Sequence, residues 1–170
     1  AVFAGIGVLT RRDLEEINWA VLWMVAGGFA LGVALNETGL AANLINSIPF
    51  NSWPVLAVLI GSGVICYTLS NFISNTATAA LLVPILAVVG KSMTAELAPI
   101  GGVACLLIGI AIAASVAMIL PISTPPNALA HGTGMIEQKY MAKSGLIMGI
   151  IGLVLGYGML ILLGSIGFFG

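Results

Sequence analysis

Small hydroxyl and amide side chains interrupt long apolar runs of this sequence at two places. The first cluster centres on Ser74-Asn75-Thr76, and the second is the segment 121–127, which contains three prolines. Freed carbonyls with hydroxyl and amide oxygens suit a hard monovalent cation, whereas the positive end of a helix restarting at Thr76 suits an anion. Paired breaks of this kind predict a site for both ions near the middle of a membrane. The polar side chains are Ser70, Asn71, Ser74, Asn75, Thr76 and Thr78 at the first break, and Ser123, Thr124 and Asn127 at the second.

The first break lies between two apolar runs that are both short for a membrane crossing. The run 53–69 precedes it and the run 77–90 follows it, while a full crossing takes about 20 residues. Asn competes for nearby backbone groups, so the two helices are expected to end and restart at the tip. The pattern predicts a re-entrant helical hairpin over residues 53–90, with its tip buried in protein or lining a wet cavity.

The second break follows a long apolar run, 97–120, which predicts a tilted crossing. Three prolines in 121–127 rule out an uninterrupted helix, because each removes a backbone donor and clashes with the preceding turn. The helix is expected to unwind there and to resume near Ala128. A last crossing is expected over 141–169, where glycines at three- and four-residue spacing allow close helix packing: Gly145, Gly149, Gly152 and Gly156.

Composition places these elements in a lipid bilayer. Hydrophobic residues make up 60% of the 170 residues, charged residues 6%, and the mean hydropathy is +1.18, so the chain lacks the polar surface of a soluble domain. It is predicted to be a multi-pass integral membrane protein. Because the chain begins within an apolar run, we expect it to be a fragment of a larger protein. Cys66 and Cys105 lie inside apolar runs and are read as free thiols.

The first fifty residues are expected to hold further membrane helices. Residues 1–9 are read as the tail of one transmembrane helix, 19–35 as a full crossing, and 38–48 as an amphipathic helix along the interface. With a re-entrant hairpin, Arg11, Arg12, Lys139 and Lys143 share one face and Lys91 lies alone on the other. The positive-inside tendency then places Lys143 in the cytoplasm, although two complete spans would give the same count.

Other interpretations of the polar clusters remain open. Ser and Thr often pack between membrane helices without a ligand. An intramembrane serine protease would use Ser62 with His131 as its base, although a histidine near a membrane face is also ordinary. A channel would need a continuous pore, and an arsenite or cation/proton antiporter would normally carry an intramembrane carboxylate, which the spans of this chain lack.

The residues of both breaks resemble a known family. The segment 74–84, Ser-Asn-Thr-Ala-Thr-Ala-Ala-Leu-Leu-Val-Pro, and the segment 120–128, Leu-Pro-Ile-Ser-Thr-Pro-Pro-Asn-Ala, are similar to the second half of the divalent anion/sodium symporters. The segments 18–28 and 38–40 also resemble the helix that precedes that hairpin. The resemblance covers nearly the whole chain, and the two motifs are specific in combination.

The resemblance implies an all-α integral membrane fold, with transmembrane helices, a re-entrant hairpin and an unwound helix that form one inverted repeat of a two-repeat transporter. Residues 1–50 would be scaffold-type helices with the interfacial helix. Residues 51–170 would be the transport-type part, with the hairpin 53–90, the broken helix 96–138 and the last helix 141–169. The family implies sodium-coupled transport of a dicarboxylate, citrate or sulfate, in a homodimer in the plasma (inner) membrane, with no enzymatic activity.

The same resemblance implies the ligands in this half. A substrate carboxylate would be held by Asn75 and Thr76, with Thr124 and Pro125 on the facing loop. Sodium would be held by the side chains of Ser70 and Asn75 and by the backbone oxygens of Ile73 and Ser123. The N-terminal half of the transporter would be the partner that completes the substrate site, the bilayer is the surrounding solvent, and no nucleic acid is expected.

Overall fold

The computed structural model describes residues 10–17 and 52–169, with scattered single positions and short runs between residues 5 and 49. Helices connected by short turns make up these described parts, and no strand occurs in them. The elements are α2 (Arg11–Glu16), α5 (Val55–Phe72), α6 (Asn75–Ser92), α7 (Thr94–Leu97), η2 (Ala98–Ile100), α8 (Gly102–Ser115), η3 (Pro121–Ser123), α9 (Pro125–Gly132) and α10 (Gln138–Ser165).

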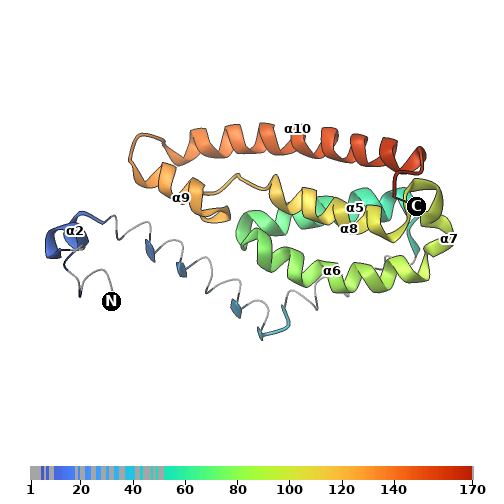
Figure 1. Cartoon of the computed structure of the whole chain (residues 1–170), viewed down its shortest axis with the longest axis horizontal. Helices are drawn as coiled ribbons and strands as arrows, with labels where there is room; N and C mark the ends of the chain where they lie inside the picture. Colours follow the sequence, from blue (N-terminus) through green and yellow to red (C-terminus); the bar gives the residue numbers. More distant parts are fainter. Residues whose placement is uncertain are drawn as a thin grey trace.

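Helices α5 and α6 form an antiparallel hairpin that packs against α8, and α10 runs along the other side of the bundle (Figure 1). Every fourth residue of α6 faces inward: Thr78, Leu82, Leu86 and Gly90 are buried. A Cβ added at Gly90 would lie 3.0 Å from Val103, so this row packs closely on α8. The hairpin and α8 therefore share one core.

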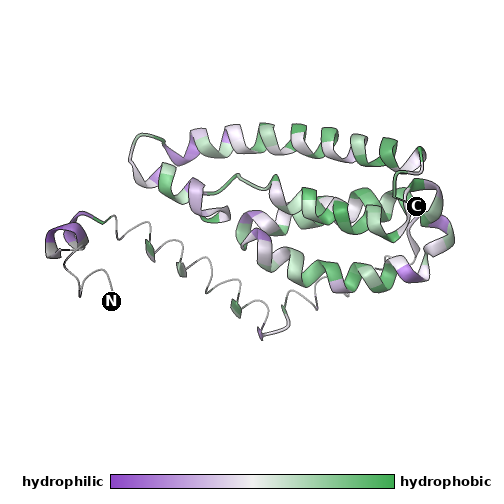
Figure 2. Ribbon diagram, viewed as in Figure 1, coloured by the Kyte–Doolittle hydropathy of each residue, from purple (hydrophilic) through white to green (hydrophobic). Residues whose placement is uncertain are grey.

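The outer faces of the bundle are largely apolar. Val88, Val154 and Leu155 are each about two-thirds exposed, and Figure 2 shows hydrophobic colour along most of the length of α5, α6, α8 and α10. Among the described residues, three helices are long and apolar enough to cross a membrane, or four if the bent pair 94–115 is one span. These features fit the predicted multi-pass membrane protein.

The two arms of the hairpin are longer than the sequence predicted. Both α5 and α6 have 18 residues, which is about 27 Å at a rise of 1.5 Å per residue and close to the ~30 Å hydrocarbon core. The expectation that both arms are too short to span was wrong, because the polar residues flanking the break are helical and only Ile73 and Ser74 interrupt the backbone. Helix length alone does not separate a re-entrant hairpin from two crossings.

The predicted crossing over 97–120 is not one continuous helix. Thr94–Ile100 and Gly102–Ser115 meet at an angle of 70°, because Gly101 adopts a left-handed conformation with φ of 98° that ends the preceding turn. At its other end α8 stops at Ser115, and the chain is non-helical from Val116 to Leu120. The unwound segment therefore begins five residues earlier than the prolines predicted.

The helix after the second break begins at Pro125, three residues before the predicted position at Ala128. Thr124 is its N-cap residue, and Pro125 and Pro126 occupy the first two helical positions. Proline is favoured at the start of a helix because the amide it lacks would have no intrahelical acceptor there. Two of the prolines that were expected to interrupt a helix therefore begin the next one.

The glycines of α10 allow the close packing that their spacing predicted. An added Cβ would overlap the Met118 carbonyl at Gly145, and the Tyr67 hydroxyl at Gly149. At Gly152 it would lie 2.9 Å from a Val116 methyl, and at Gly156 2.6 Å from an Ile112 methyl. This face of α10 therefore lies directly against α5, α8 and the unwound segment.

The predicted crossing 19–35, the interfacial helix 38–48 and the helix tail 1–9 lie largely outside the described residues. The short helix α2 within this region has a capping box, in which the Thr10 amide and hydroxyl both donate to the Asp13 carboxylate at 2.7 Å. These bonds hold the pKa of the exposed Asp13 carboxyl below its usual range.

Candidate functional site

The tip of the hairpin is a two-residue connection that the side chain of Ser74 stabilises. Ser74 caps α6, and its hydroxyl oxygen accepts from the Ala77 amide at 3.2 Å. The next two amides, of Asn75 and Thr76, are the first of the helix and have no intrahelical acceptor. They point out of the positive end of an 18-residue helix, where an anion is favoured.

Ser70 and Asn75 bring two oxygens together across this tip. The Ser70 hydroxyl donates to Asn75 Oδ1 at 2.6 Å. The same hydroxyl lies 3.3 Å from the carbonyl oxygen of Ala114, in the last turn of α8. Ser70 is fully buried and Asn75 is half-buried, so three oxygens from α5, α6 and α8 meet in a water-poor position.

Asn71 joins the hairpin to the unwound segment. Its Oδ1 accepts from the Ile119 amide at 2.8 Å, and its backbone carbonyl accepts from the Ser123 hydroxyl at 3.1 Å. Its Nδ2 donates to the Tyr67 carbonyl one turn earlier in α5, at 2.8 Å. The backbone of the second break is therefore held in part by a side chain of the first.

Residues that follow the unwound segment also stabilise the second break. Asn127 Nδ2 donates to the Met118 carbonyl at 3.1 Å, and the Leu120 amide donates to the Ser123 hydroxyl at 3.3 Å. The Thr124 hydroxyl oxygen accepts from the Asn127 amide at 3.3 Å, which leaves the hydroxyl proton of Thr124 available for another acceptor. Figure 1 shows α9 beginning beside the tip of the hairpin.

The structure brings most of the sequence-predicted site residues to this one end of the bundle. Ser70, Ile73 and Ser123 are buried, while Thr76 and Pro125 are exposed. The sequence analysis named Asn71 among the polar residues of the break but gave it no role. The sequence near Asn71 does not indicate its role, because its partners Ile119 and Ser123 are 48 and 52 residues away in the chain.

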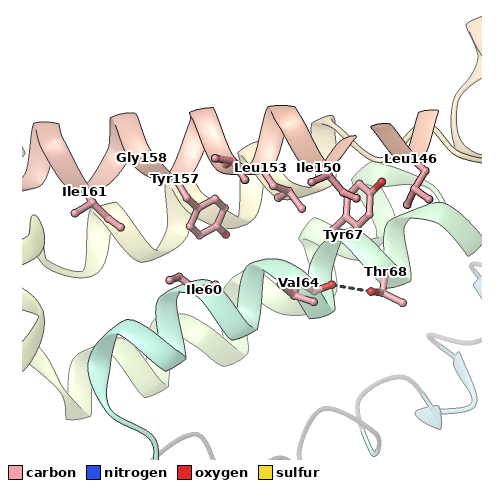
Figure 3. A pocket seen from close by; sticks show the side chains of 11 residues that line it. Ile60, Val64, Tyr67, Thr68, Leu146, Ile150, Leu153, Tyr157, Gly158 and Ile161 are labelled. Carbon is pink, nitrogen blue, oxygen red and sulfur yellow. Dashed lines mark hydrogen bonds between the residues drawn. The ribbon is translucent and has the colours of Figure 1, made fainter. Parts of the chain in front are cut away.

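A separate cavity of about 600 Å³ lies between α5 and α10 (Figure 3). Its walls are mainly aliphatic, with Tyr67 and Tyr157 crossing from one helix toward the other. Within the described part of the chain, the hydroxyl groups of Tyr67, Tyr157 and the buried Thr78 have no hydrogen-bond partner. An aliphatic cavity does not offer the oxygen ligands that a small ion requires, so the candidate site is the hairpin tip with the unwound segment.

These features define a class of protein. A hairpin with a polar tip, packed against a helix that unwinds beside it, is the arrangement by which secondary transporters bind ions and substrates between broken helices.

The comparison with known proteins identifies the family. The profile described as "Sodium:sulfate symporter transmembrane region" matches residues 7–166, and the chain belongs to this family of multi-pass membrane transporters. The family is one of transporters and not of enzymes, which removes the serine protease hypothesis for Ser62 and His131.

The chain is similar to several curated relatives. It is 33% identical to "Na(+)/dicarboxylate cotransporter 3" of Rattus norvegicus over 85% of this chain and 23% of the relative. It is 34% identical to "Sodium-dependent dicarboxylate transporter SdcS" of Staphylococcus saprophyticus over 82% of this chain and 26% of the relative. An "Uncharacterized transporter" of Haemophilus influenzae is 35% identical over 88% of this chain and 32% of its own length. The chain thus spans about a quarter to a third of these relatives.

Proposed function

We propose that this chain belongs to the C-terminal half of a sodium-coupled secondary transporter of divalent organic anions, such as a dicarboxylate or citrate, or of sulfate. It would supply one sodium site and half of the substrate site. The observation that carries the proposal is the 2.6 Å contact between Ser70 Oγ and Asn75 Oδ1, beside a helix end that favours an anion. The family and the dicarboxylate relatives support the same substrate class.

The oxygens around Ser70 fit a sodium ion as a transported substrate. A hydroxyl has one proton and two acceptor lone pairs. If Ser70 turns its proton from Asn75 to the Ala114 carbonyl at 3.3 Å, both Ser70 Oγ and Asn75 Oδ1 become free to coordinate a cation. The implied backbone ligands at Ile73 and Ser123 belong to the two buried turns on either side. Binding of sodium would thus replace one internal hydrogen bond by another.

The anion would lie at the start of α6. The amides and side chains of Asn75 and Thr76 can donate there, and Thr124 offers its hydroxyl proton from the facing loop. The start of α9 is a weaker donor because Pro125 and Pro126 have no N–H and the Asn127 amide already bonds Thr124. Pro125 would contribute contact surface only.

Charge balance supports coupling between the two ions. Between residues 52 and 136 the only charged side chains are Lys91 and Glu96, and neither belongs to the hairpin tip or to the unwound segment. An anion bound at the tip would therefore be stabilised by helix ends and by sodium, so each ion should favour the other. This provides a physical reason for symport.

The remaining parts of the proposal concern the assembly. The hairpin 53–90 would be re-entrant, residues 51–170 would move as the transport-type part, and residues 1–50 would belong to the scaffold. The N-terminal half of the parent would complete the substrate site, and the parent would be a homodimer in the plasma membrane.

Calorimetry on the purified full-length parent tests the function. Succinate, citrate and sulfate would be titrated at low and at high sodium, with choline replacing sodium as the control cation. The proposal expects at least one anion to bind more tightly as sodium rises. Anion affinity that is the same in sodium and in choline would overturn it, and proton release on anion binding would favour the antiporter.

A further inference from the structure

We propose that Asn71 is a positioning residue that couples cation binding at the hairpin tip to the conformation of the anion-binding loop. The inference rests on the function proposed above and adds a residue that the family resemblance does not assign. Asn71 would touch neither ion. It would transmit the geometry of the tip to residues 119–124.

The contacts of Asn71 reach both sides of the site. It is 3% exposed, and the three bonds described above are all to groups inside the protein. Two of these bonds run to the unwound segment, one from the Ile119 amide to Oδ1 and one from the Ser123 hydroxyl to the backbone carbonyl. The third, to the Tyr67 carbonyl, fixes the orientation of the amide plane.

The position of Asn71 next to Ser70 gives these contacts a consequence. Ser70 is one residue earlier in the same turn and holds the candidate cation oxygens, whereas Asn71 holds the loop. A cation bound between Ser70 Oγ and Asn75 Oδ1 would push these oxygens apart from their 2.6 Å contact and would shift this last turn of α5. Ile119 and Ser123 would shift with it, and Ser123 precedes Thr124, whose hydroxyl is proposed above to donate to the anion. Coupling through fixed bonds suits this region because its side chains carry no charge.

Asparagine has the two functions that the position needs. Its amide oxygen accepts from Ile119 while its amide nitrogen donates to Tyr67. Asn71→Leu keeps similar size and removes both functions, which leaves the Ile119 amide without its acceptor. Asn71→Gln keeps both amide functions without adding a charge and is the conservative variant. The bond from Ser123 is to the backbone and is available to both variants.

The test uses the full-length parent and two measurements. The first is the ratio of anion dissociation constants at low and at saturating sodium, for whichever of succinate, citrate or sulfate binds. We expect Asn71→Leu to reduce this ratio at least fivefold, within the usual range of coupling factors, and to leave sodium binding within about twofold, since no cation ligand is removed. Asn71→Gln should retain most of the ratio. The control is Thr68→Val, which removes a hydroxyl bonded only to Val64 on the exposed face of α5 and should change neither value.

The second measurement is structural and does not depend on transport. Spin labels at Phe72 and Leu129, which are 55% and 63% exposed, report the separation of the tip from α9. Asn71→Leu should broaden this distance distribution, and Asn71→Gln and Thr68→Val should not. An unchanged distribution together with an unchanged sodium ratio in Asn71→Leu would overturn the positioning role.

The two proposals fail in distinguishable ways. If wild-type protein shows no sodium-linked anion binding, the proposed function is wrong, and broadened distances in Asn71→Leu would still support the link between tip and loop. If wild type is sodium-coupled and Asn71→Leu weakens sodium and anion equally with the ratio preserved, only the positioning role is wrong. Should Asn71→Leu fail to fold, Asn71→Ser decides by the same two readouts, because its shorter side chain no longer reaches Ile119.

Discussion

The Ser70 hydroxyl donates to the Asn75 amide oxygen at 2.6 Å, across a break of only two residues. This contact places a residue from the last turn of α5 against the first residue of α6. Both atoms are oxygens, and the hydroxyl proton has a second acceptor in the Ala114 carbonyl. The pair can therefore change from a hydrogen bond to a cation site when this proton rotates and the two oxygens move apart to admit the ion.

Removing the Ser70 hydroxyl should weaken sodium binding selectively. Ser70→Ala deletes one cation oxygen, and a contact to a charged group is worth roughly 1.5–3 kcal/mol, so the sodium concentration for half-maximal uptake should rise about tenfold or more. Anion affinity at saturating sodium should change much less. Sodium titrations of uptake by the reconstituted parent measure both, with Ser70→Thr as the hydroxyl-retaining control. Unchanged sodium dependence in Ser70→Ala would make Ser70 a packing residue.

Two substitutions at Asn75 should separate its two roles. Asn75→Asp keeps an oxygen for the cation but replaces the amide donor by a negative charge beside the expected anion. Anion binding should be lost even at high sodium, because no basic residue lies in this half of the site to offset the charge. Asn75→Ala deletes both contacts and should weaken sodium and anion together. Calorimetry at low and high sodium distinguishes them, and anion affinity like that of wild type in Asn75→Asp would refute the assignment.

The topology of the hairpin can be tested by labelling. If α5 and α6 enter and leave on the same side, cysteines at Ser92 and Glu37 should both react with an impermeant thiol reagent from outside, and one at Lys139 should not. The reagent reacts only with accessible thiols, and all three positions, Ser92, Glu37 and Lys139, are exposed in the described structure. Reaction of Ser92 and Glu37 from opposite sides of the membrane would show a single crossing between them and exclude the re-entrant hairpin.

The packing of α10 on the unwound segment should be sensitive to one methyl group. Gly145→Ala would place a Cβ against the Met118 carbonyl and 2.9 Å from the Ile119 Cα, at a cost of about 1–3 kcal/mol for overpacking. Gly158→Ala on the same helix meets nothing within 4 Å, and should be neutral or stabilising by up to about 1 kcal/mol through helix propensity. Thermal unfolding of the parent in detergent compares them. Equal melting temperatures would show that α10 does not pack tightly there.

The sequence alone determined the features that depend on local chemistry. Apolar runs with charges only at their ends require a membrane, the polar residues around Ser74 predict a break between two helices, and prolines after Leu120 prevent a continuous helix. The spacing of glycines in α10 correctly predicted a close-packed face. The two motifs together also identified the family, which the match over residues 7–166 confirms. None of these conclusions needs a contact between distant parts of the chain.

The tertiary structure decided where α8 ends and which side chains form hydrogen bonds with the unwound backbone that follows it. Nothing in the sequence from Val116 to Leu120 forbids a helix, yet α8 ends at Ser115. The freed backbone groups are satisfied instead by partners elsewhere, the Ile119 amide by Asn71 and the Met118 carbonyl by Asn127. Buried backbone groups must find such partners in a membrane. Whether Asn71 is one of them depends on α5 lying beside this segment, and only the packing of α5 against α8 makes that contact.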